Sequence, residues 1–162
     1  MPRQDDPSID GDMLLYRRVP PFAGRVIWTE NGAEATGQNF SDGQDELSVY
    51  IATETTPDEV LAGNDGYGVV AIPARVVREA CRTADGQPAV IICRDDEEPA
   101  RGHTLVCGHI SPGMRKKLKR AAQWVRLPTR VNYDSPADET PRGDTPQPPA
   151  GPDACTPPAS SS

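Results

Sequence analysis

The stretch LSVYIAT, which begins at Leu47, shows the clearest periodicity in the chain. Leu47, Val49 and Ile51 fall on one side of an extended backbone, whereas Ser48 and Tyr50 fall on the other. Such alternation is typical of a strand that turns one face toward a hydrophobic core. We therefore predict a strand here, with its branched apolar residues facing inward.

The residues that follow this strand indicate a short helix. Thr56 can cap a helix, Pro57 suits its first turn, and Glu59 is placed to complete a capping box. Gly63 is a suitable end. We therefore expect about two turns at most.

Further elements are predicted on the C-terminal side. Residues 68–72 and 103–110 read as strands, and residues 74–82 as a helix with an apolar stripe. Residues 89–93 form a continuous apolar run, which favours a central strand. A last helix is expected from a cap at Ser111 to just before Pro128.

On the N-terminal side, residues 14–19 and 25–29 are predicted strands. Residues 30–44 are polar and glycine-rich without a periodic pattern, so a long loop is expected there. Strands interleaved with short helices predict an α+β fold. The expected architecture is a single small domain with a mixed sheet of five or six short strands and two or three helices.

Composition divides the chain into three parts. Residues 1–11 are polar and are expected to be flexible, and residues 12–128 carry the predicted domain. Residues 129–162 contain 8 prolines and few apolar residues. A segment of that kind buries too little surface to offset the entropy of ordering, so it is predicted to be a disordered tail.

The composition also bears on the cellular setting. The N-terminus lacks the apolar centre of a signal peptide, and no apolar run is long enough to span a bilayer. Three of the four cysteines lie in apolar stretches without metal-site or disulfide spacing. We expect a cytoplasmic protein with no membrane association, and its preference for Ala, Arg, Asp and Pro over Lys is typical of a GC-rich bacterial genome.

Charge is strongly polarised along the chain, whose net charge is -7. Residues 9–110 contain 17 acidic and 8 basic residues, whereas residues 111–128 contain 6 basic and no acidic ones. Such asymmetry bears on partners rather than on fold. The predicted last helix therefore carries a candidate contact surface, formed by Arg115, Lys116, Lys117, Lys119 and Arg120.

Three explanations of this basic helix are open. It can lie over the acidic surface of its own domain, dock on an acidic protein partner, or follow a nucleic-acid backbone. No aromatic platforms accompany the basic residues, which disfavours single-stranded nucleic acid. The leading functional hypothesis is an accessory or interaction module that binds an acidic protein partner; the sequence does not indicate an oligomeric state.

His103, Cys107 and His109 are residue types that can bind a metal or act in cysteine catalysis. Residues two apart share a strand face, but residues four apart are about 13 Å distant, so one ion cannot reach all three without a bulge. Cys93 would have to supply a further ligand. Nothing marks Cys107 as an activated nucleophile. We predict no metal site.

Three short segments suggest an alternative enzymatic function. They are Leu15-Tyr16-Arg17-Arg18-Val19, Asn39-Phe40-Ser41 and Ser48-Val49-Tyr50, followed by the capped helix. Over residues 14–80 this order resembles the N-terminal half of the ADP-ribosyltransferase-like superfamily, including RES-type toxins. The LxRR start, the SVYxA strand and the basic helix ending in AxxWV also resemble small bacterial proteins, a likeness that implies no activity.

The superfamily resemblance implies an NAD site. The resemblance implies four catalytic residues: Arg18, Ser48, Tyr50 and a glutamate, which is either Glu59 or Glu79. Arg17, Arg18 and Asn39 would bind the cofactor. An arginine can hold a pyrophosphate through two hydrogen bonds. Under this alternative the protein would be an ADP-ribosyltransferase or an NAD hydrolase that acts as a toxin or defence effector, and NAD is the expected cofactor. Under the leading hypothesis no cofactor is predicted.

Overall fold

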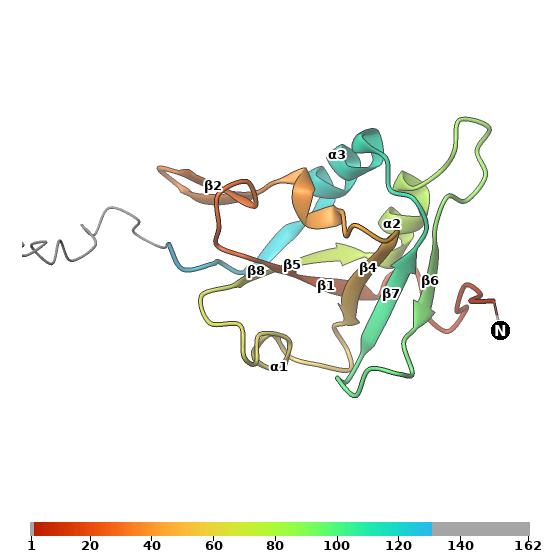
Figure 1. Cartoon of the computed structure of the whole chain (residues 1–162), viewed down its shortest axis with the longest axis horizontal. Helices are drawn as coiled ribbons and strands as arrows, with labels where there is room; N and C mark the ends of the chain where they lie inside the picture. Colours follow the sequence, from red (N-terminus) through yellow and green to blue (C-terminus); the bar gives the residue numbers. More distant parts are fainter. Residues whose placement is uncertain (1, 131–162) are drawn as a thin grey trace, which may run out of the picture. The chain divides into compact units, whose positions relative to one another are not determined.

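The computed structural model describes residues 2–130 and confirms the α+β class (Figure 1). Its main sheet has six strands in the order β6-β7-β4-β1-β5-β8, and every pairing in it is antiparallel. The strands are β1 (Leu14–Val19), β4 (Glu46–Ile51), β5 (Gly68–Pro73), β6 (Ile91–Arg94), β7 (His103–Cys107) and β8 (Gln123–Arg126).

The central strand β4 has the predicted orientation. Leu47, Val49 and Ile51 are buried in the main hydrophobic core. Ser48 lies on the opposite face, and Tyr50 joins a second, smaller apolar cluster there. The alternation thus identified the inward side of the sheet correctly.

The two faces of the sheet are covered differently. Helices α2 (Ala74–Ala80) and α3 (Pro112–Ala121) contribute Val77 and Leu118 to the main core. Helix α1 (Pro57–Val60) packs Val60 on the other face beside Tyr50. Both Thr56 before α1 and Ser111 before α3 cap their helices as predicted. We call the α2–α3 side the covered face and the α1 side the open face (Figure 1).

The prediction for the end of the last helix is wrong. The helix ends at Ala121, and the following residues form strand β8 against β5. Trp124 explains the change, because its ring packs on the core and its Nε1 donates a hydrogen bond of 2.7 Å to the carbonyl of Ala33. Gly68 permits this approach, since a Cβ there would lie 2.7 Å from the Trp124 ring.

Two other predictions also need correction. The expected loop at 30–44 contains strand β3 (Gly32–Ala35), which pairs with β2 (Val26–Thr29), and the 3-10 helix η1 (Gly37–Phe40). The small residues of β3 give no periodic signal, so only the pairing reveals the strand. The apolar run ending in β6 lies at the edge of the sheet, not at its centre.

The N-terminal stretch, expected to be flexible, packs against the domain in the structure. Ile9 is 1 % exposed and belongs to the main core. The backbone N–H of Asp6 donates to the carbonyl of Ile92 at 2.8 Å, and Asp5 pairs with Arg78 at 3.1 Å. The buried Ile9 and these polar contacts hold residues 5–9 against the domain, although the polar composition of the N-terminus predicted flexibility.

The residues around the predicted C-terminal boundary still contact the domain. Pro128 is buried, and the N–H of Thr129 donates to the carbonyl of Gly66 at 2.9 Å. The predicted tail falls almost entirely outside the described residues. Within residues 2–130, no helix combines the length and the apolar character that crossing a bilayer requires.

Candidate functional site

A polar cleft of about 590 Å³ lies on the open face of the sheet. Four of its lining residues are those predicted from the superfamily resemblance: Arg18, Ser48, Tyr50 and Glu59. They come from β1, β4 and α1, so residues 41 positions apart in sequence meet at one site. We call this site the open-face cleft.

Strand register determines the centre of the open-face cleft. Tyr50 lies opposite His103 on β7, and their rings meet edge to face with centroids 5.1 Å apart. The guanidinium carbon of Arg18 lies 5.5 Å from the centre of the Tyr50 ring, within the range of a cation–π contact. Arg18, Tyr50 and His103 therefore form a continuous stack along this face.

Carboxylates occupy the rim of the open-face cleft. Asp95 Oδ2 lies 3.1 Å from Nδ1 of the buried His103. Glu59 accepts a hydrogen bond from the backbone N–H of Thr56 at 2.8 Å, and this bond lowers the pKa of Glu59 below its ordinary value. Its other oxygen lies 3.8 Å from Arg101. Glu59 is thus largely engaged in capping α1.

The remaining predicted site residues lie away from this cleft. Arg17 points to the covered face, where it donates to the carbonyls of Asn39 and Ser48 at 2.9 Å and pairs with Asp42 at 2.8 Å. Burial lowers the pKa of Arg17, although Asp42 opposes this effect. Asn39 is fully buried, and its side chain donates to the carbonyl of Arg25 at 2.7 Å.

Glu79, the alternative glutamate, also lies elsewhere. It is an exposed residue of α2, on the other side of the sheet from the cleft. The cleft therefore contains Glu59 but neither Glu79 nor the pair Arg17 and Asn39.

The second candidate site is the basic face of α3, defined by Arg115, Lys116, Lys117, Lys119 and Arg120. Lys119 lies 3.7 Å from Glu34 on β3. The other four form no ion pair with any residue from 2 to 130. Within the described chain, the acidic residues of the domain therefore neutralise the basic face of α3 through one contact, the long ion pair between Lys119 and Glu34.

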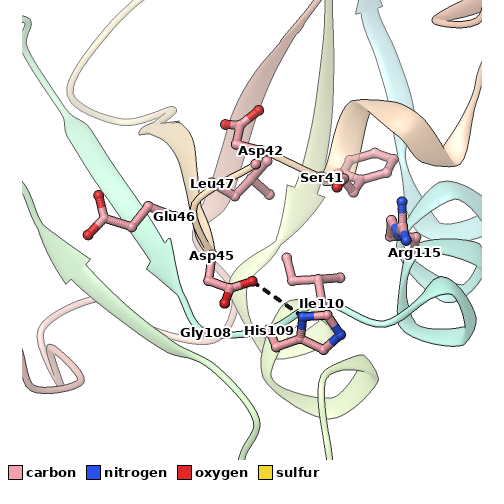
Figure 2. A pocket seen from close by; sticks show the side chains of 11 residues that line it. Ser41, Asp42, Asp45, Glu46, Leu47, Gly108, His109, Ile110 and Arg115 are labelled. Carbon is pink, nitrogen blue, oxygen red and sulfur yellow. Dashed lines mark hydrogen bonds and ion pairs between the residues drawn. The ribbon is translucent and has the colours of Figure 1, made fainter.

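A smaller pocket of about 220 Å³ adjoins this basic face (Figure 2). Arg115 enters its lining from α3, and its Nε is buried without a hydrogen-bond partner among the described residues. Figure 2 shows Arg115 near Ser41 and the pair of Asp45 and His109 further along the lining. We call this site the Arg115 pocket.

The acidic residues that line the Arg115 pocket each have a basic partner. Arg17 pairs with Asp42, and His109 Nδ1 lies 3.3 Å from Asp45. Glu46 pairs with Arg3. Arg115 is consequently the lining cation without a carboxylate partner in the described part of the chain.

Gly108 determines where His109 lies. Its φ is +130°, and a Cβ there would lie 2.2 Å from the carbonyl oxygen of Ala89, so only glycine fits. Its N–H donates to the carbonyl of Asp45 at 2.7 Å. This break in the strand separates exposed His109 from the face that Cys107 and His103 share.

No group of three or more His, Cys, Asp or Glu side chains is arranged to hold a metal among residues 2–130. Cys107 and Cys93 lie close together, with sulfurs 3.6 Å apart, but the break at Gly108 directs His109 toward Asp45 instead. Cys107 therefore lies beside Cys93, while His109 lies beside Asp45, and the residues do not converge on one point.

Sequence reasoning missed several of these neighbours. Asp95 reaches the open-face cleft because it follows β6, and His103 reaches it because β7 pairs with β4. Asp42, the partner of Arg17, lay in a segment without any pattern. One signal was available for His103: on the predicted strand it lies two residues before Leu105, so the two share a face.

Comparison with known proteins finds no significant match. No protein-family model fits the chain, and neither a curated protein nor a solved structure matches it significantly.

Proposed function

We propose that the protein is an interaction module that binds an acidic protein partner through the basic face of α3. One observation carries the proposal: Arg115, Lys116, Lys117 and Arg120 have no ion-pair partner in residues 2–130. These cations are displayed by a helix that the core holds through fully buried Leu118. A rigid display of unpaired charges favours recognition, because little order is lost when a partner binds.

The Arg115 pocket supports an acidic partner more specifically. A buried guanidinium nitrogen without an acceptor is costly, and a carboxylate that enters the pocket would satisfy it. The pocket's own carboxylates are already paired, so they compete little for Arg115. Arg115 would bind one carboxylate of the partner, while Lys116 and Arg120 would contribute at the exposed rim.

The proposal can be tested with poly-L-glutamate as a defined acidic probe. Fluorescence anisotropy would follow its binding to the full chain as the salt concentration is raised. Contacts between exposed charges are screened by salt, so binding should weaken steeply. The Lys116→Glu variant should weaken binding about fivefold, and Arg115→Gln should weaken it more, since Arg115 is the less exposed contact.

Arg82→Glu is a matched control, because Arg82 is an exposed arginine just after α2 and its replacement by Glu changes the net charge by the same amount as Lys116→Glu. It should leave the affinity within about twofold. Equal losses for Lys116→Glu and Arg82→Glu would contradict the proposal, as would binding that ignores salt. Tighter binding to duplex DNA than to poly-L-glutamate would identify nucleic acid as the partner instead.

A second candidate function is an NAD-using enzyme, favoured by the common cleft of Arg18, Ser48, Tyr50 and Glu59. The fit to the cofactor is partial. Several carboxylates of the cleft suit the cationic nicotinamide ring, but they would repel a pyrophosphate. Arg18 could hold a phosphate there, whereas Arg17 is occupied by Asp42.

Release of nicotinamide from NAD would test this candidate. If the cleft is catalytic, Tyr50→Phe and Ser48→Ala should each reduce the release at least tenfold. Tyr16→Phe provides the control, since Tyr16 lies on the same face and packs near Tyr50 without lining the cleft. The enzymatic candidate fails if the unmodified chain releases no nicotinamide.

A further inference from the structure

Two cysteines meet on the open face at the edge of the sheet. Cys93 on β6 lies opposite Leu105, and Cys107 on β7 lies opposite Ile91, so the two are diagonal neighbours across one strand pair. Their sulfurs are 3.6 Å apart, close enough for a thiol of one to donate to the other. Neither is part of a disulfide in the structure.

The surroundings of the two sulfurs differ. Burial, together with the hydrogen bond to Cys107, raises the pKa of Cys93 to about 12, so Cys93 is a protonated thiol near neutral pH. Cys107 is half-buried, and the Arg3 guanidinium, which also pairs with Glu46, donates to its sulfur at 3.5 Å. A cationic group beside a partly exposed sulfur is typical of reactive cysteines.

We propose that Cys93 and Cys107 form a reversible disulfide when the protein meets a hydroperoxide. The proposal goes beyond either function considered above and depends on neither. It rests on the contact between the sulfurs, on the edge position of β6 and on the guanidinium at Cys107.

The reaction has two steps. The sulfur of Cys107, as a thiolate, attacks a peroxide oxygen; the O–O bond breaks, an alcohol or water leaves after protonation, and Cys107 becomes a sulfenic acid. The sulfur of Cys93 then attacks the sulfur of Cys107, the S–O bond breaks and water leaves, carrying the proton that Cys93 loses. The two cysteines lose two electrons in total, and the peroxide gains them.

The fold permits this closure. A disulfide needs the sulfurs about 1.6 Å nearer than they now lie. Rotation of the two cysteine side chains can supply part of that movement, and β6 is an edge strand that pairs with β7 on one side and is held on the other by the N-terminal segment, through the bond from Asp6 to Ile92, rather than by a further strand. A bridge that requires backbone adjustment is more easily reduced than a relaxed one, which makes the modification reversible.

The other cysteine of the described core is a natural reference. Cys81 is fully buried, and burial raises its pKa to about 11. It has no sulfur partner in residues 2–130. A difference in reactivity between Cys81 and Cys107 would therefore reflect the environment at the edge of the sheet.

The experiment uses the full chain carrying Cys155→Ser, which removes the tail thiol and its intermolecular products. The reduced protein is treated with one equivalent of hydrogen peroxide, its remaining thiols are alkylated, and its peptides are mapped by mass spectrometry. We expect a peptide containing Cys93 linked to one containing Cys107, with two hydrogens lost, and release of the link by dithiothreitol. Cys81 should be recovered in its alkylated form, which shows that the peroxide did not oxidise it.

Three variants assign the steps. Cys93→Ser should leave Cys107 as a sulfenic acid that dimedone traps, whereas Cys107→Ser should give no dimedone adduct on Cys93. Arg3→Ala, a change at an exposed residue that should not disturb folding, is expected to slow disulfide formation roughly threefold. Arg101→Ala, also at an exposed arginine, should leave the rate unchanged.

Three results would overturn the proposal. The first is that Cys93 and Cys107 remain free thiols after peroxide treatment. The second is that Cys81 oxidises as fast as Cys107. The third is a dimedone adduct on Cys93 in the Cys107→Ser variant at the same yield as on Cys107 in the Cys93→Ser variant.

Discussion

Arg17 and Arg18 are neighbours in sequence, yet they belong to opposite faces of the sheet. Arg17 is buried on the covered face, where Asp42 and two carbonyls bind its guanidinium. Arg18 lines the open-face cleft and rests on the Tyr50 ring. On the covered face the charge of Arg17 is neutralised by contacts within the fold. On the open face Arg18 lies beside a cavity that a ligand could enter.

This contrast separates a structural role from a functional one. A buried charge needs partners for every donor, so its surroundings are fixed and it cannot also bind a ligand. Groups that line a solvent-filled cleft are not so constrained. The superfamily resemblance treated both arginines as candidates, and burial distinguishes them.

The largest effect is expected at Arg17. Arg17→Ala leaves Asp42 without its partner on the covered face and two carbonyls without donors, so the free energy of unfolding should fall by about 4 kcal/mol. Arg18→Ala, the matched change one residue away, should cost at most about 1 kcal/mol. Urea denaturation measures both, and equal losses would remove the distinction between the faces.

Leu118 tests how far the covered face depends on α3. Its side chain is fully buried, so Leu118→Ala should lower the free energy of unfolding by about 3 kcal/mol. Leu127→Ala is the control at a residue that is 54 % exposed, with an expected change within about 0.5 kcal/mol. Thermal or urea unfolding compares them; a small effect at Leu118 would mean that α3 is not an integral part of the core.

The two capping boxes allow the helices of the two faces to be compared directly. Ser111→Ala and Thr56→Ala each remove a side-chain acceptor for a backbone N–H and should cost about 1 kcal/mol. Hydrogen exchange should show faster exchange at the start of α3 in the first variant and in α1 in the second. If either variant loses protection from exchange throughout both helices, the expectation that each cap stabilises only its own helix is wrong.

The smallest effect is expected at a partly exposed ion pair, in contrast to the buried pair of Arg17. Arg94 donates two hydrogen bonds to Glu54, at 2.7 and 2.8 Å, and this contact lowers the pKa of Glu54 below its ordinary 4.5. The contact therefore stabilises the fold above about pH 4.5, and this contribution disappears as pH falls through the lowered pKa.

The Glu54→Gln variant isolates that contribution. It should be less stable than the unmodified protein by about 0.5 kcal/mol near pH 7, since both side chains are more than one third exposed. The difference should shrink as pH falls below 4.5 and vanish once the carboxylate of the folded protein is protonated. Urea midpoints across this pH range provide the measurement, and a difference that grows toward low pH would contradict the assignment.

Local patterns predicted much of the fold correctly. The alternation from Leu47 identified the inward side of β4, and two Ser/Thr-Pro signals located the starts of α1 and α3. Each of these depends on residues within one turn or one strand, where the periodicity of the backbone is enough.

The errors arose where distant contacts override local preference. Residues 123–126 continue the helical spacing of α3, but pairing with β5 and burial of Trp124 make them a strand. Residues 1–11 are polar and were expected to be flexible, but Ile9 fills part of the core. For the candidate site, the superfamily resemblance implied that Arg17, Arg18, Ser48 and Tyr50 line one cleft. The structure brings the last three together there, whereas Arg17 lies on the covered face with Asp42.

By itself, then, the sequence determined the α+β class, the core side of the central strand, the helix starts and the polarised charge. Tertiary structure decided which neighbours meet: Arg18 with Tyr50 and His103, Arg17 with Asp42, and Cys93 with Cys107. The physical reason is strand register. Residues 53 positions apart become neighbours when β7 pairs with β4, and no local periodicity encodes which two strands pair.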